Sequence, residues 1–171
     1  MSKSKEKTEI LNELQSSQKI ERMAWQMLEN NSLEKEIVLA GIAHRGYMLA
    51  SIFKRKLEAI SSVKVILVEV CVNKKSPHEK EVSIDVDPKK LEGKSVIVVD
   101  DVLNSGRTML HALTPFIQFP VKSLSIACLL NRSYRNFPVA AKYIGMSLST
   151  TLQEHIEVEI AKIGSIRAYL M

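Results

Sequence analysis

Short uninterrupted hydrophobic runs alternate with helical patterns along this chain. The runs long enough for a strand that is buried on both faces are residues 37–42, 63–72, 96–99 and 124–130. Hydrophobic residues recur at three- and four-residue spacing, as on one face of a helix, in residues 6–30, in 47–60 and after Thr108. This alternating order predicts an α/β fold, a mostly parallel sheet flanked by helices on both faces.

The segments between these elements complete the predicted organisation. Turn-forming and charged residues fill residues 73–80 and predict a mobile loop, and the alternation in 82–86 fits the return strand of a hairpin. At 171 residues the chain has room for one well-buried domain. We therefore expect a single domain over residues 1–171, in which residues 1–18 form a basic arm or an extension of the first helix.

Composition narrows the class of protein. A net charge of +5 would suit an anionic ligand or nucleic acid, but much of the excess lies near the N-terminus, at Lys3, Lys5, Lys7, Lys19 and Arg22. No secretory signal and no run of membrane-spanning length is present. Cys71 and Cys128 lie in hydrophobic runs without metal-binding spacing, so we expect buried, reduced thiols. These features predict a cytoplasmic protein that does not bind membranes.

The segment 95–113 holds the candidate chemistry. Asp100 and Asp101 come where the hydrophobic strand 96–99 should end, and a polar turn containing Gly106 leads into the next helical pattern. A turn and a helix start offer backbone N–H groups to a phosphate, while adjacent carboxylates accept hydrogen bonds from sugar hydroxyls. The pattern therefore indicates a sugar-phosphate site, and the alternative is an ordinary strand–helix unit with an acidic strand end.

This segment resembles the phosphoribosyl pyrophosphate (PRPP) motif of the type I phosphoribosyltransferases. That motif is a hydrophobic strand, two acidic residues and a small-residue loop ending in Gly-x-Ser/Thr. The resemblance implies a core of parallel strands with a small hood, and transfer of the 5-phosphoribosyl group to a nitrogen nucleophile with the help of Mg²⁺. It also implies that Asp100 and Asp101 are catalytic, holding the ribose hydroxyls and the metal, directly or through water.

The resemblance assigns the phosphates to two loops. The 5′-phosphate is expected on the loop formed by Asn104, Ser105, Gly106, Arg107 and Thr108, where Thr108 is also placed to cap the following helix. The pyrophosphate is expected on Ala43, His44, Arg45 and Gly46, a loop that in this family often contains a non-proline cis peptide. Arg45 would add catalytic donors. Residues 73–80 resemble a flexible lid, in which Lys74, Lys75 and Lys80 could reach the phosphates, and the alternative for each is a solvated hairpin tip.

Downstream segments resemble one subgroup, the bifunctional pyrimidine-operon attenuator/uracil phosphoribosyltransferases. They are the arginine- and proline-bearing stretch 130–139, a hood turn at 143–151 and a late strand at 156–160. Uracil is therefore the expected base. Asn104 stands where purine-salvage relatives usually carry an aspartate base, which disfavours hypoxanthine or guanine without excluding them. A PRPP-sensing, RNA-binding regulator with little activity is the other alternative.

RNA binding is disfavoured by departures from that subgroup. Arg22 and Arg135 match its RNA-binding members, but Glu21, Trp25 and Met146 replace hydrogen-bonding or cationic residues. Trp25 could stack on a base, but it lies on an apolar helix face, where a place in the core or in an interface is expected. The apolar faces of the first helix and of the motif helix suggest a homo-oligomer.

Overall fold

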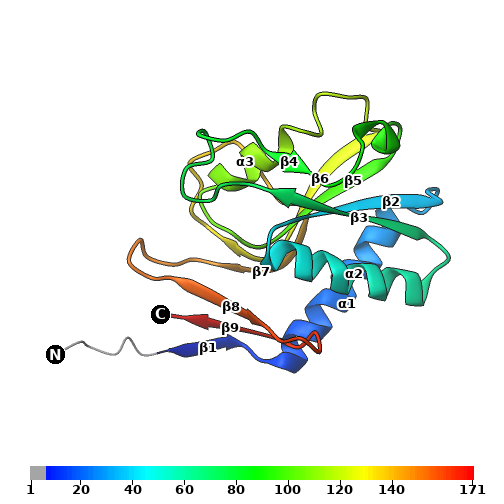
Figure 1. The fold of residues 1–171 in the computed structure, drawn as a ribbon. Coiled ribbons are helices and arrows are strands. Elements are labelled where there is room, and N and C mark those ends of the chain that lie inside the picture. Colours follow the sequence, from blue (N-terminus) through cyan, green and yellow to red (C-terminus); the bar gives the residue numbers. More distant parts are fainter. Residues whose placement is uncertain (1–6) are drawn as a thin grey trace.

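The computed structural model describes residues 7–171, which form two separate β-sheets with helices packed between and above them (Figure 1). In chain order the elements are β1 (Thr8–Leu11), α1 (Glu13–Asn30), β2 (Glu36–Ile42), α2 (Arg45–Ile60), β3 (Lys64–Cys71), β4 (Ser83–Ile84), the 3₁₀ turn η1 (Pro88–Leu91), β5 (Ser95–Leu103), α3 (Arg107–Leu113), β6 (Ser123–Arg132), β7 (Tyr143–Leu148), β8 (Ile156–Ile160) and β9 (Ile166–Leu170). Residues 1–6 of the expected basic arm lie outside the described residues.

The larger sheet has the strand order β4-β3-β2-β5-β6-β7 and is parallel except for β4. Its central strand β5 is buried on both faces because its side chains alternate between two cores. Ile97 and Val99 pack with α1 and α2, whereas Val96 and Val98 pack on the side of α3. This double burial explains the uninterrupted hydrophobic runs and confirms the predicted fold class.

Helix α1 begins later than its hydrophobic pattern predicts. The Asn12 side chain accepts a hydrogen bond from the Gln15 backbone N–H, and the Gln15 side chain accepts one from Asn12 N–H, which makes a capping box. Before this cap, β1 pairs with β9 as a strand. The predicted helix start at residue 6 is therefore wrong, because Ile10 and Leu11 belong to a sheet and only the part from Glu13 onward is helical.

The hood is the three-stranded antiparallel sheet β1-β9-β8, which lies beside α1 and α2 and apart from the larger sheet (Figure 1). Leu11, Ile156, Val158 and Ile166 are buried in the same core as α1 and α2, so apolar packing fixes the hood to the body. The late strand at 156–160 is confirmed as β8. The predicted hood turn at 143–151 is wrong in its first part, because β7 is the edge strand of the larger sheet.

The structure corrects two predictions of burial, one in β3 and one on α1. Cys128 is buried as expected, but Cys71 is exposed. It ends β3 beside the two-residue β4, where the alternation of the strand places Val70 in the core and Cys71 outward. Trp25 is 49% exposed on α1, so it is not a core residue.

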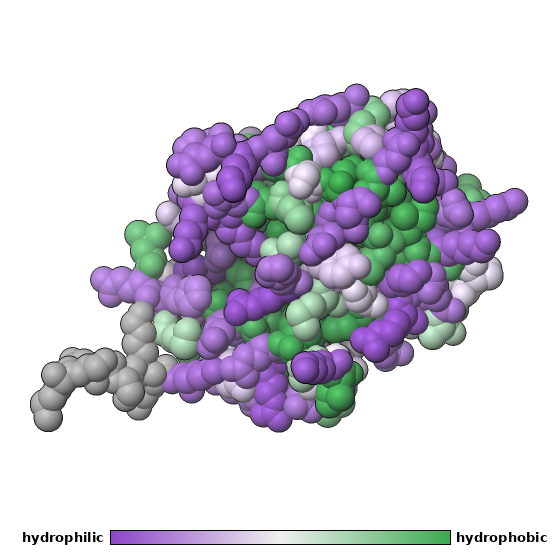
Figure 2. Space-filling model, in the orientation of Figure 1, coloured by the Kyte–Doolittle hydropathy of each residue, from purple (hydrophilic) through white to green (hydrophobic). Residues whose placement is uncertain are grey.

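The polarity of the surface differs between β3 and the carboxyl ends of the strands. In the view of Figure 2, hydrophobic side chains gather over β3, while the surface where the hood meets the carboxyl ends of the strands is largely hydrophilic. Ligands of parallel α/β sheets bind beyond the carboxyl ends of the strands. Within residues 7–171, no helix is both long and apolar enough to span a membrane.

Candidate active site

The acidic pair lies inside β5 rather than at its end. Strand β5 continues to Leu103 because β6 runs beside it as far as Arg132, and Asp100 lies opposite Cys128 in that ladder. Asp100 and Asp101 are only 6% and 5% exposed. The Asp101 backbone N–H donates to the Asp100 carboxylate at 3.0 Å, which orders the two residues relative to each other.

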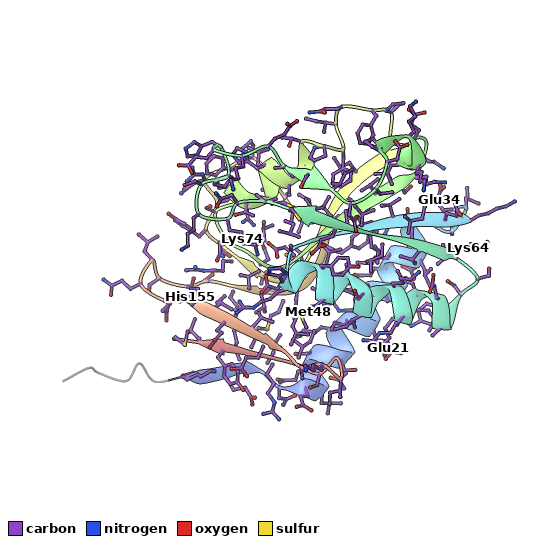
Figure 3. The ribbon with its side chains drawn as sticks, viewed as in Figure 1. Glu21, Glu34, Met48, Lys64, Lys74 and His155 are labelled. Carbon is purple, nitrogen blue, oxygen red and sulfur yellow. The ribbon has the colours of Figure 1, made fainter. Side chains whose placement is uncertain are left out.

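A cavity of about 240 Å³ brings the predicted residues together. Its wall contains both aspartates, Arg45 and the whole loop Asn104–Thr108. It also contains Lys74 of the predicted lid and two hood residues that the sequence does not suggest, His155 and Ile156. Figure 3 shows Lys74 and His155 on the same side of the molecule, Lys74 from the loop after β3 and His155 from the residue just before β8. Only the packing of the hood brings His155 there.

Two half-exposed cations face the acidic pair. The Lys74 Nζ lies 3.7 Å from Asp100 Oδ1, and Arg45 Nη1 lies 3.8 Å from Asp101 Oδ2. Burial raises the pKa of Asp100 well above the ordinary aspartate value, the negative charge of Asp101 raises it further, and Lys74 opposes both effects. A further positive charge close to Asp100 would therefore stabilise the ionised form of this carboxyl group.

The loop after β5 turns at Gly106, whose φ of +89° is a conformation that favours glycine. Gly106 is the N-cap of α3, so the predicted capping role of Thr108 is wrong, because the helix already begins at Arg107. The Ser105 hydroxyl instead accepts a weak hydrogen bond, 3.4 Å long, from the Arg107 backbone N–H. Thr108 still lines the cavity and keeps its hydroxyl available to a ligand.

The segment after β6 braces this loop from outside. The backbone N–H groups of Asn136 and Phe137 both donate to the Ser105 carbonyl, at 3.0 and 3.1 Å. Arg135 donates to the Asn104 backbone carbonyl. A Cβ on Gly106 would lie 2.5 Å from the Val139 Cγ2, so the two segments are in close contact. The bracing fixes the shape of the loop before any ligand binds.

The residues of the loop after β2 line two different hollows. The Ala43–His44 peptide bond is cis, as the resemblance suggests. Arg45 lines the main cavity, but Ala43 and His44 line a neighbouring hollow together with Lys80. A Cβ on Gly46 would lie 2.5 Å from the Val99 carbonyl, so Gly46 lets α2 begin directly against β5 and places Arg45 beside Asp101.

The predicted lid, residues 73–80, contacts the loop Asn104–Thr108. Arg107 Nη2 lies 3.0 Å from His78 Nδ1, a contact between residues that are 29 positions apart. Among the lid lysines only Lys74 reaches the main cavity, since Lys80 lines the neighbouring hollow. Residues 73–80 therefore reach the cavity wall at Lys74 and contact the loop after β5 through His78.

The acidic pair has the chemistry that Mg²⁺ prefers. Mg²⁺ takes oxygen ligands, and proteins often bind it through one or two carboxylates together with the phosphates of a substrate. Among residues 7–171 there is no group of three or more acidic, histidine or cysteine side chains able to hold a metal ion. Two buried carboxylates facing an open cavity therefore fit a metal whose shell a phosphorylated substrate completes.

This combination of fold and site agrees with comparisons to known proteins. Residues 6–161 match the family described as the phosphoribosyl transferase domain, and the chain belongs to that family. It is 30% identical over 160 residues to the "Bifunctional protein PyrR" of Streptococcus thermophilus, covering 92% of both chains. A protein of the same name from Enterococcus faecalis is also 30% identical, with 90% of both chains covered. The resemblance inferred from the sequence is confirmed.

Solved structures support the same fold. A hypoxanthine-guanine phosphoribosyltransferase from Bacillus anthracis superposes with a TM-score of 0.74 at 22% identity, over 96% of this chain and 98% of that chain. A hypoxanthine phosphoribosyltransferase from Trypanosoma cruzi gives a TM-score of 0.71 at 18% identity, over 84% and 79% of the two chains. At these identities the likeness concerns the fold, and the choice of base rests on the site.

Proposed function

We propose that this protein is a cytoplasmic, Mg²⁺-dependent uracil phosphoribosyltransferase. The single observation that carries the proposal is the cavity in which the acidic pair, the Gly106 turn, Arg45 and Lys74 meet. These groups match the three parts of PRPP: a ribose with two hydroxyls, a 5′-phosphate and a pyrophosphate.

Each part of the donor has its own group of residues. Asp100 and Asp101 accept hydrogen bonds from the ribose hydroxyls and place negative charge near the carbon that becomes cationic. The 5′-phosphate binds the loop Asn104–Thr108, whose backbone N–H groups, hydroxyls and Arg107 supply donors. Arg45 and Lys74 release their weak contacts to the acidic pair and hold the pyrophosphate, assisted by the backbone of Ala43, His44 and Gly46.

The reaction exchanges one bond for another at the ribose C1. The bond from C1 to the pyrophosphate oxygen breaks and its electrons leave with pyrophosphate, while the N1 lone pair of uracil forms the new C1–N bond. The N1 proton is released together with pyrophosphate, so the products are UMP and pyrophosphate. A bound Mg²⁺ supplies charge neutralisation on the leaving group, and Asp100 and Asp101 are the residues that would hold it.

Uracil is favoured over a purine base by the residue at the start of the phosphate loop. Asn104 has an amide where a carboxylate would be needed to accept a proton from a purine ring. The curated relatives named PyrR match the chain more closely than the hypoxanthine-guanine enzymes, whose likeness is one of fold. A purine phosphoribosyltransferase is therefore the second enzymatic possibility.

An RNA-binding regulator is disfavoured because the two matching arginines are already engaged. Arg22 Nη2 donates to the carbonyls of Ile144 and Gly145, and Arg135 donates to the backbone of Asn104. Binding an RNA phosphate would break these contacts. Gel-shift titration with pyrimidine-operon leader RNA tests this alternative, and tight binding that weakens steeply with salt would support the regulator.

We also propose that the protein is a homo-oligomer. Leu14 and Trp25 are exposed on α1, where a second copy would cover them. Sedimentation of the full chain measures this directly.

The decisive assay measures pyrophosphate release from PRPP and Mg²⁺ with uracil, orotate, hypoxanthine and guanine in parallel. Uracil is expected to give the highest kcat/KM, and Asp101→Asn is expected to lower it by about 100-fold or more, because the variant removes charge at the developing cation. Retention of full activity by both Asp100→Asn and Asp101→Asn would refute the assignment of the acidic pair.

A further inference from the structure

Arg132, the last residue of β6, is a buried cation whose hydrogen bonds all go to neutral oxygens. It is 8% exposed. Its Nε donates to Thr150 Oγ1 at 2.7 Å, and its Nη2 donates to the backbone carbonyls of Thr151 and Glu154 at 3.0 and 3.2 Å. No carboxylate of residues 7–171 forms a salt bridge with it. Buried arginines are usually paired with an acid, so this one is held by neutral oxygens at a cost.

The fourth hydrogen bond of Arg132 reaches the phosphate loop. Its Nη1 lies 3.1 Å from the Asn104 side-chain oxygen. A guanidinium group only donates hydrogen bonds, so the amide oxygen must face Arg132. The Asn104 Nδ2 has no hydrogen-bond partner in the part of the chain that the structure describes, and Asn104 lines the cavity. Arg132 thereby leaves the amide N–H₂ for a ligand.

The same side chain connects this amide to the hood. Three of its four hydrogen bonds go to residues 150–154, the segment that leads to His155 at the cavity wall. The Arg132 guanidinium group therefore holds Asn104 and residues 150–154 at a fixed separation. A base bound between them would meet a hydrogen-bond donor of fixed direction.

We propose that Arg132 is a positioning residue that sets base specificity through Asn104. By holding the amide oxygen, it directs the amide nitrogen to donate to a carbonyl oxygen beside the nucleophilic nitrogen of the base. Uracil carries such a carbonyl next to N1, whereas a purine that attacks through N9 presents N7–H in the imidazole ring and requires an acceptor. This inference rests on the proposed function and adds the reason for its choice of base.

The substitution Asn104→Asp tests whether a hydrogen-bond donor at this position selects uracil and an acceptor selects a purine. A carboxylate keeps one oxygen on Arg132 and turns the other atom from a donor into an acceptor. We expect kcat/KM for uracil to fall by about 10- to 100-fold and the ratio of hypoxanthine to uracil turnover to rise by a similar factor. The substitution Arg132→Gln releases the amide, and we expect a raised KM for uracil with KM for PRPP changed less than about threefold.

Arg135→Gln is the matched control. Arg135 holds the backbone carbonyl of Asn104 rather than its amide, so this variant is expected to weaken PRPP binding without changing the order of the bases. Thermal unfolding and calorimetry with Mg²⁺ and PRPP, on every variant, establish that the compared proteins are folded and bind the donor.

The outcomes distinguish the inference from the function beneath it. Wild-type turnover with uracil, combined with a shift toward hypoxanthine in Asn104→Asp and a selective rise of KM for uracil in Arg132→Gln, supports the inference. Wild-type turnover with an unchanged base ratio in Asn104→Asp, or equal effects of Arg132→Gln on both KM values, overturns it while the proposed function stands. Failure of the folded wild type to use any base overturns the proposed function, and the inference with it.

Discussion

Replacing Gly106 with alanine should damage the phosphate loop in two separable ways. At φ +89° an L-residue costs about 1–2 kcal/mol relative to glycine. The new Cβ would also lie 2.5 Å from Val139 Cγ2 and 3.1 Å from Arg135 Cδ. Forcing an extra methyl group into a packed contact of this kind costs about 1–3 kcal/mol. Gly106→Ala should therefore lower the free energy of unfolding by about 2–5 kcal/mol.

Gly93 provides the matched control. It also has a positive φ, +68°, but a Cβ there would meet no atom within 4 Å. Gly93→Ala should therefore cost only the backbone part, about 1–2 kcal/mol. Gly93 lies at the amino ends of the strands, away from the acidic pair, so PRPP affinity should be unchanged in this variant and reduced in Gly106→Ala.

Urea unfolding of both variants, and of Gly106→Ala in a Val139→Ala background, measures the two parts. Truncating Val139 removes the closest contact, so Gly106→Ala should cost about 1–3 kcal/mol less in that background. Equal costs for Gly106→Ala and Gly93→Ala would refute the claim that the segment after β6 shapes the phosphate loop.

Two further predictions concern titratable groups. Burial and the charge of Asp101 raise the pKa of Asp100, so the native state keeps this proton to higher pH than the unfolded chain does. The stabilising contribution of the protonated Asp100 is complete below the ordinary pKa of 3.8 and is lost as the pH rises through the raised pKa. Asp100→Asn should therefore be more stable than the wild type by about 1–2 kcal/mol at pH 8. Near about pH 4 the two proteins should differ little in stability. Equal stability of the two proteins at both pH values, in denaturant titrations, would contradict this. Burial raises the pKa of the Cys128 thiol to about 12, whereas Cys71 is exposed. A thiol reagent at pH 8 should therefore modify one thiol of the native protein, and Cys71→Ser should abolish the reaction.

The sequence predicts the sheet well because its strands are buried on both faces. A run such as Val96–Val99 contains only apolar residues, so its pattern fits a strand at the centre of a parallel sheet. The same reasoning ends the strand too early, since it treats Asp100 and Asp101 as a boundary. The neighbouring strand β6 continues the ladder past them, which is a property of the pair of strands rather than of either sequence.

The hood and the arginine contacts depend on tertiary packing that no local pattern contains. Ile10 and Leu11 have helical spacing with Leu14, yet pairing with β9 makes them a strand. The four acceptors of Arg132 come from positions up to 28 residues away, on the loop after β5 and on the segment that joins β7 to β8. The sequence identifies the acidic pair and the Gly106 turn because they form a local motif. The contacts of Arg132 become visible only in the folded structure.

Calorimetric titration of the folded protein with PRPP and Mg²⁺ measures directly whether the acidic pair and the Gly106 turn bind the sugar donor. We expect saturable heat at one donor per chain, and binding at least about tenfold weaker in Asp101→Asn because a charged ribose contact is lost. A folded wild-type protein that gives no heat with Mg²⁺ and PRPP would contradict the assignment of this cavity as a PRPP site.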